Sequence, residues 1–153
     1  GPMSDDMIKI RLMYDDDFED VVRIDERIMK TSRPEYYKLK FERLFETGEF
    51  LPTSLVAEDH DENVIGFIMG ELYIGEYGIS NEGATIDTIG VDPDFRRLGV
   101  GERLMDEFID HLKQLGVQRI HTLVEKSDKQ LLKYFNANRF SPSKTVVNLE
   151  RSI

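Results

Sequence analysis

Apolar residues recur along the chain with two spacings, one typical of strands and one typical of helices. Alternation of apolar and polar residues predicts a strand, and apolar residues three and four positions apart predict an amphipathic helix. The predicted elements, in chain order, are strand Ile8–Leu12, helix Phe18–Met29, a helix from Pro34 to Gly48, strands Ser54–Glu58, Val64–Ile74 and Ala84–Val91, helix Glu102–Leu115, strand Arg119–Glu125, a helix from Asp128 to Asn138, and strand Lys144–Leu149. This order, β-α-α-β-β-β-α-β-α-β, predicts an α/β (α+β) domain with a mixed, mostly antiparallel central sheet flanked by helices.

Residues that favour helix ends lie at several of these boundaries. Pro34 suits the first turn of a helix, Gly116 suits the position after a helix, and Asp128 suits an N-cap. The acidic triplet Asp15–Asp17 precedes the first predicted helix. Carboxylates at that place cap the helix and match its dipole, so we favour capping over a metal site and expect no metal cofactor.

The most informative stretch is Val-Asp-Pro-Asp-Phe-Arg-Arg-Leu-Gly-Val-Gly at positions 91–101. It follows a predicted strand and precedes a predicted helix. A glycine-rich turn that opens a helix directs several backbone N–H groups at one spot, and the helix dipole makes that spot attractive to phosphate. The pattern is neither G-x-G-x-x-G nor G-x-x-x-x-G-K-[ST], so it does not indicate a dinucleotide fold or a P-loop.

The spacing Arg96-x-x-Gly99-x-Gly101, with Ile89-Gly90-Val91-Asp92-Pro93 before it, resembles the pyrophosphate loop of the GNAT superfamily of acyl-CoA-dependent N-acetyltransferases. The order of elements from about residue 8 to 149 resembles the whole GNAT fold. The resemblance implies that strands 84–91 and 119–125 part from one another. The arm of acetyl-CoA, the implied cosubstrate, would lie between them.

Several residues receive cofactor-binding roles from this resemblance. The backbone of Ile89 and Val91 would pair with the pantetheine arm, and Gly90 would permit a bulge between them. The N–H groups from Arg97 to Glu102 would hold the pyrophosphate. The cofactor-binding positions are Ile89, Gly90, Val91, Arg96, Arg97, Leu98, Gly99, Val100, Gly101, Glu102 and Asp128.

Acetyl transfer to an amine needs a base, an oxyanion donor and a proton for the leaving thiolate. Asp87 is the predicted base, because relatives such as spermidine N-acetyltransferases carry a carboxylate at the matching place; Glu71 and Glu125 are second choices. We expect the side chain of Asp87 to share a face with Thr85, Ile89 and Val91. The family's tyrosine acid is replaced by Phe135. Tyr134 lies one residue away, about 100° around the helix, and is the predicted acid, with water as the alternative.

The chain has 153 residues and a net charge of −10, which argues against nucleic acid as a partner. The charge is uneven: residues 126–153 carry a net +4 and residues 1–125 a net −14. An acidic domain favours a cationic acceptor. There is no apolar run of membrane-spanning length and no cysteine, so we expect a cytoplasmic protein without a membrane partner.

The expected function is therefore transfer of an acetyl group from acetyl-CoA directly to a primary amine, such as a protein lysine or a polyamine. The acceptor would be contacted by the linker Lys30–Pro34 and the loop Gly75–Gly83. The alternatives are a non-catalytic acyl-CoA sensor, favoured by Phe135, and a protein adaptor whose loop binds nothing. Residues 1–4, beginning Gly1-Pro2, look like a tag remnant, and we expect residues 5–153 to form one domain. The family resemblance also implies a homodimer.

Overall fold

The computed structural model describes residues 7–46, 53–74 and 82–153. Its elements are β1 (Lys9–Leu12), the short 3-10 helix η2 (Asp15–Asp17), α1 (Phe18–Met29), α2 (Pro34–Phe45), β2 (Leu55–Glu58), β3 (Val64–Ile74), β4 (Glu82–Val91), the 3-10 helix η4 (Pro93–Leu98), α3 (Val100–Gln114), β5 (Ile120–His121) and α4 (Lys129–Ala137). The chain divides into two compact units, one ending at Thr122 and one beginning at Leu123.

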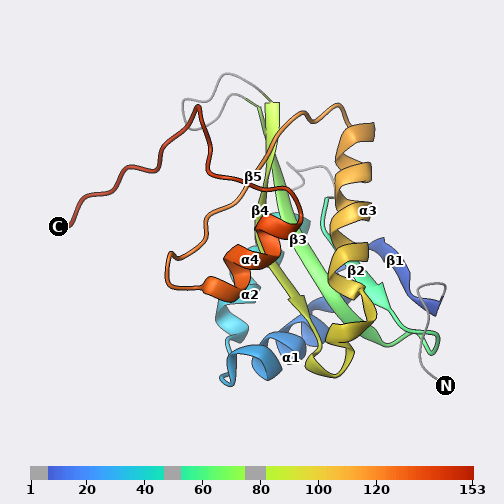
Figure 1. Ribbon diagram of the computed structural model, residues 1–153. Coiled ribbons are helices and arrows are strands. Elements are labelled where there is room, and N and C mark those ends of the chain that lie inside the picture. Colours follow the sequence, from blue (N-terminus) through green and yellow to red (C-terminus); the bar gives the residue numbers. More distant parts are fainter. Residues whose placement is uncertain (1–6, 47–52, 75–81) are drawn as a thin grey trace. The chain divides into compact units, whose positions relative to one another are not determined.

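The first unit is built on a five-stranded sheet with the order β1-β2-β3-β4-β5 (Figure 1). The first four strands pair antiparallel and β5 joins β4 in parallel. Parallel neighbours need a crossover between them, and α3 supplies it. The mixed, mostly antiparallel sheet with flanking helices confirms the predicted fold class.

Helices pack on both faces of this sheet. On one face, α1 and α2 contribute Val21, Ile24, Tyr37 and Phe41 to a core that includes Phe67 of β3. On the other face, α3 lies so close that a Cβ at Gly70 would be 2.6 Å from the ring of Phe108. Because successive strand residues point to opposite faces, β3 separates these two layers. Glycine at position 70 therefore allows the helix and the sheet to approach.

Most elements lie where the sequence pattern predicts them, but two predicted strands are wrong. Of the strand predicted at Arg119–Glu125, only Ile120–His121 joins the sheet. The hydroxyl of Thr122 donates to the carbonyl of Ile86 at 3.1 Å, so a side chain takes the place of the next backbone bond. The strand predicted at 144–149 is absent from the second unit. There the hydroxyl of Ser143 accepts the backbone N–H groups of Thr145 and Val146, which directs them to a local turn.

The remaining differences are at element ends. Helix α3 begins at Val100, two residues earlier than predicted, and α2 ends at Phe45. The predicted end of α2 at Gly48 lies outside the described residues, as does most of the loop predicted at 75–83. Glu82 and Gly83 belong to β4.

Candidate functional site

Strands β4 and β5 pair over a short length only. The ladder contains Ala84↔Ile120 and Thr85↔His121, and the hydroxyl of Thr122 donates to the carbonyl of Ile86 next to it. Within the described chain, the part of β4 from Asp87 to Val91 therefore extends beyond its pairing with β5. Strand β5 ends at His121, and the parting of strands 84–91 and 119–125 that the family resemblance implies stays a prediction.

The register with β3 shows where the backbone of this segment points. The N–H of Asp92 donates to the carbonyl of Ile65 at 2.8 Å, on one side of the Gly66↔Val91 pair. In an antiparallel ladder, this makes Gly66 and Val91 a non-hydrogen-bonded pair, whose own N–H and C=O groups point away from each other. The same holds two residues earlier, at Ile89. The backbone groups of Ile89 and Val91 therefore face away from β3, along the part of β4 that lies beyond its pairing with β5. We call this side of residues 87–91 the open edge. An extended ligand can bind to such an edge as a strand does.

A β-bulge interrupts β4 at Asp87. Met69 pairs with Thr88 and Gly70 pairs with Ile86, so Asp87 is an extra residue without an opposite partner on β3. The prediction of a bulge at Gly90 is wrong, since Gly90 lies in register opposite Phe67. Glycine is needed there for another reason: a Cβ would lie 2.8 Å from the ring of Phe67.

The bulge also corrects the predicted face of Asp87. The Asp87 carboxylate accepts from the ammonium of Lys40 on α2, so its side chain is on the α1–α2 face. Ile89 and Val91 pair with Ile68 and Gly66, and a Cβ at Gly66 would point at α3. Asp87 therefore shares a face with Thr85, as expected, but Ile89 and Val91 are on the opposite one. The extra residue reverses the alternation.

Lys40, which the sequence interpretation did not single out, pairs with the predicted base Asp87. Its Nζ lies 2.5 Å from Oδ2 of Asp87 and 4.4 Å from the centre of the Tyr36 ring. The side chain of Asp87 is 34% exposed and that of Lys40 is 17% exposed. The carboxylate is thus neutralised by an internal cation and still reaches solvent. The sequence contains one signal for the contact between Lys40 and Tyr36: the two residues are four positions apart and therefore lie on one face of the helix.

A second polar cluster lies next to the bulge and is largely buried. Arg33 binds both carboxylate oxygens of Asp25, at 2.9 and 2.6 Å, and the hydroxyl of Tyr37 donates to Asp25 at 2.8 Å. Burial of the ring raises the pKa of Tyr37 above its ordinary value; a hydrogen bond with Thr88 opposes the shift, and the bond to Asp25 adds to it. Tyr37 therefore holds its proton and ties α1 and α2 to the bulged part of β4.

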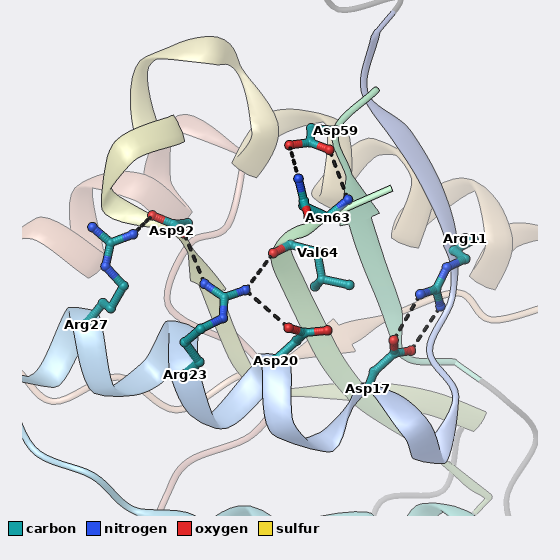
Figure 2. Close-up of polar contacts among 9 residues, drawn as sticks. All are labelled: Arg11, Asp17, Asp20, Arg23, Arg27, Asp59, Asn63, Val64 and Asp92. Atoms are coloured by element: carbon teal, nitrogen blue, oxygen red, sulfur yellow. Dashed lines mark hydrogen bonds and ion pairs between the residues drawn. The ribbon is translucent and has the colours of Figure 1, made fainter. Parts of the chain in front are cut away.

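The turn after β4 is held by Asp92, which is 4% exposed. Its carboxylate accepts the N–H of Asp94 at 3.0 Å and thereby caps η4. Arg27 and Arg23 of α1 both donate to the same carboxylate (Figure 2), the second at 3.4 Å. The turn is therefore attached to α1 as well as to the sheet.

The predicted phosphate loop follows directly. Gly99 has φ +76°, in the left-handed region that favours glycine, and joins η4 to α3. The bond from the N–H of Arg103 to the carbonyl of Gly99 is the start of the helical ladder. The amides of Val100 and Glu102 come before it in the first turn of α3, and first-turn N–H groups as a class have no acceptor within an ideal α-helix. The structure thus brings the loop residues Arg96 to Glu102 together at one helix start, with the side chains of Arg96, Arg97 and Glu102 exposed.

Asp128 and Tyr134 belong to the second unit. Asp128 caps α4, as predicted, by accepting the N–H of Leu131 at 3.0 Å. Tyr134 is half-buried and packs edge-on against the ring of Phe135 at 5.4 Å. Phe135 is buried and contacts Phe140. The tyrosine and the phenylalanine therefore have different environments within α4.

The described residues contain no group of three His, Asp or Glu side chains arranged to hold a metal ion. None of their helices is long and apolar enough to cross a membrane.

Comparison with known proteins identifies the family. The model of the acetyltransferase (GNAT) family matches residues 13–139. A mycothiol acetyltransferase from Propionibacterium freudenreichii subsp. shermanii is 32% identical over 93 residues. That alignment covers 61% of this chain and 29% of the relative, so the chain spans only about a third of the curated relative's length.

Solved structures share the fold at low identity. An aminoglycoside acetyltransferase from an uncultured soil metagenomic sample, in complex with sisomicin, is 17% identical with a TM-score of 0.71, over 97% of this chain and 98% of that one. An aminoglycoside 6'-N-acetyltransferase from Acinetobacter baumannii is 15% identical with a TM-score of 0.73, over 95% and 99%. An aminoglycoside N-acetyltransferase in complex with CoA is 17% identical with a TM-score of 0.73, over 95% of each chain. Since the family model covers most of the sequence and the fold agrees throughout, this chain belongs to the acetyltransferase (GNAT) family.

Proposed function

We propose that this protein transfers an acetyl group from acetyl-CoA directly to a primary amine. The observation that carries the proposal is one continuous stretch of β4, η4 and α3. In it, a strand edge without a β5 partner leads through a capped turn to a left-handed glycine and a helix start. The first part suits an extended amide-bearing arm, and the second suits a diphosphate.

The cofactor would be held mainly by backbone groups. Ile89 and Val91, which face the open edge, would pair with the pantetheine amides, and the Val91 N–H would donate to the thioester oxygen. The amides of the loop would hold the diphosphate, with Arg96 and Arg97 adding positive charge. The CoA complex of a fold neighbour supports this choice of cosubstrate. The proposed cofactor-binding residues are Ile89, Gly90, Val91, Arg96, Arg97, Leu98, Gly99, Val100, Gly101, Glu102 and Asp128.

Asp87 is the proposed base. A primary ammonium must lose a proton before its nitrogen attacks, and an alkyl ammonium has a pKa of about 10 in water. Asp87 would take that proton directly or through water. The nitrogen then bonds to the acetyl carbon and loses its second proton to water as the C–S bond breaks. The thiolate takes a proton from water or from Tyr134, which water then protonates again. No covalent enzyme intermediate is needed when both substrates are held together.

The acceptor is proposed to be cationic. Most of the acidic charge belongs to residues 1–125, which attracts cations. A protein lysine and a polyamine both satisfy this condition. The aminoglycoside acetyltransferases among the fold neighbours support a small-molecule amine as well. All of these acceptors present a primary amine with positive charge nearby.

The test combines binding with turnover. Titration calorimetry with acetyl-CoA should show saturable binding that desulfo-CoA shares. A free-thiol release assay over polyamines, aminoglycosides, amino acids and lysine peptides should then show turnover with at least one cationic class. Binding of acetyl-CoA with no thiol release from any amine would favour the sensor alternative. Lack of binding would reject the cofactor assignment.

A further inference from the structure

Asp92 is the most heavily bonded residue of the segment that joins β4 to the loop. Its N–H donates to the carbonyl of Ile65 at 2.8 Å, and its own carbonyl accepts the N–H of Phe95 at 2.8 Å. Its carboxylate accepts the N–H of Asp94 and the guanidinium groups of Arg23 and Arg27. One buried residue thus contacts β3, η4 and α1.

The two arginines are arranged to reach this carboxylate together. Arg23 and Arg27 are four residues apart on α1 and point from the same face of the helix towards Asp92 (Figure 2). Arg23 also donates to the carbonyl of Val64 at 3.0 Å, and Arg27 to Asp94 at 3.1 Å. The first arginine therefore connects Asp92 to the start of β3, and the second connects it to η4.

Burial makes these bonds important for the geometry of the turn. The side chain of Asp92 is 5% exposed, whereas those of Arg23 and Arg27 are 46% and 40% exposed. A buried carboxylate needs compensating charge and donors, and it keeps the geometry that supplies them. Breaking the contact costs the partly hydrated arginines less free energy than it costs the buried carboxylate, because water can replace it at the arginines. The constraint thus acts mainly on the position of Asp92 and of η4 behind it.

We propose that Asp92, held by Arg23 and Arg27, is a positioning residue for cofactor binding. We call these three residues the α1 clamp. It sets the direction in which η4 leaves β4 and so aligns the first-turn amides of α3 with the open edge at Val91. None of the clamp residues needs to contact the cofactor. This inference rests on the proposed function, because the ligand of the loop is acetyl-CoA there.

A second buried aspartate provides a matched control. Asp59 accepts the N–H groups of Asp61 and Asn63, both at 2.9 Å, and the side-chain amide of Asn63 at 3.1 Å. Asp59 is 9% exposed, and these bonds and those of its backbone join it to residues 61–63 of the turn between β2 and β3. Asp59→Asn and Asp92→Asn therefore remove the same charge from two buried turns. Only the second turn leads to the loop.

The experiment measures acetyl-CoA affinity by calorimetry, kcat and KM by thiol release, and melting temperature for Asp92→Asn, Asp59→Asn, Arg27→Gln and the double variant Asp92→Asn/Arg27→Gln. We expect Asp92→Asn to raise the Kd and KM for acetyl-CoA about tenfold with kcat nearly unchanged. Asp59→Asn should lower the melting temperature and leave the Kd as in the wild type. The double variant should bind no more weakly than Asp92→Asn alone, because both changes break one contact.

A readout without cofactor accompanies these measurements. Hydrogen exchange of the amides from 97 to 103 should be faster in apo Asp92→Asn than in the wild type, and unchanged in Asp59→Asn. Wild-type Kd and exchange in Asp92→Asn would overturn the clamp. Equal losses of affinity in both aspartate variants would show that lower stability weakens binding, and would overturn the clamp. Additive losses in the double variant would show that Arg27 acts on binding independently of Asp92, through Asp94 or the cofactor, and would overturn the clamp. If the wild type itself binds no acetyl-CoA, the proposed function fails, and the clamp fails as a cofactor device with it.

Discussion

The phosphate loop can be tested by two nearly isosteric substitutions at one glycine. Gly99 has φ +76° and is the N-cap of α3. Asn and Asp both tolerate this conformation better than other side chains, and both cap helices well. Gly99→Asn therefore adds bulk and strain, while Gly99→Asp adds the same bulk and strain together with a negative charge. The difference between the two variants isolates the effect of charge at the helix start.

The size of this difference follows from Coulomb's law. Two charges of a diphosphate at about 6 Å from the new carboxylate cost about 1.4 kcal/mol with the dielectric constant of water and about 5.5 kcal/mol at an effective value of about 20. The smaller figure is about a tenfold change in Kd. The Asp variant should therefore bind acetyl-CoA at least about tenfold more weakly than the Asn variant. Its melting temperature should be equal or higher, because a carboxylate stabilises a helix N-terminus.

Calorimetry at low salt and at about 1 M salt, where the Debye length is about 3 Å, provides the assay. The gap between the two variants should narrow at high salt. Equal affinities of the Asp and Asn variants at low salt would refute the reasoning, because no diphosphate could then lie at this helix start. If the Asp variant melts at a lower temperature than the Asn variant, its weaker binding would be explained by partial unfolding instead of by charge.

Three further predictions concern the acid, the base and the buried tyrosine. Asp87→Asn should lower kcat by about 10²-fold or more with the Kd for acetyl-CoA unchanged. Glu71→Gln, which removes another sheet carboxylate that pairs with α2, should keep kcat, and the reverse result would identify Glu71 as the base. Tyr134→Phe should lower turnover by about 10²-fold if Tyr134 protonates the thiolate, and wild-type turnover would assign that proton to water. Tyr37→Phe should cost about 1–2 kcal/mol at pH 7, since it leaves the buried Asp25 without one donor. Because the pKa of Tyr37 is raised in the folded state above its ordinary value of 10.0, unfolding releases a proton above that pH and wild-type stability falls as pH rises. In urea titrations the deficit of Tyr37→Phe should therefore shrink above pH 10, and a constant deficit would contradict the assignment.

Local sequence was sufficient to predict most of the helices and strands. Helix α1 and strand β3 have the predicted bounds, and Gly116 follows α3 with φ +83°. These features depend on residues within a few positions of one another, such as apolar spacing, caps and glycine. The phosphate loop is of the same kind, because its order of strand, turn, glycines and helix can be recognised without knowledge of distant contacts.

The sequence pattern could not predict which strands pair with one another or in which register. The pattern at 119–125 and 144–149 is that of a strand, but a strand exists only where a neighbouring strand accepts its backbone bonds. The bulge is of this kind too. It is a mismatch of one residue between β3 and β4, and neither strand reveals it alone.

The sequence by itself determined the four α-helices and the strands β1 to β4, the position of the predicted loop, and the family that the chain resembles. The tertiary structure alone decided that Asp87 pairs with Lys40 and that Asp92 is bonded to α1. It also decided that the backbone groups of Ile89 and Val91 face the open edge. The physical reason is the same in each case. Helix and turn preferences are set by neighbours in sequence, whereas register and ion pairing are set by residues that only the folded chain brings together.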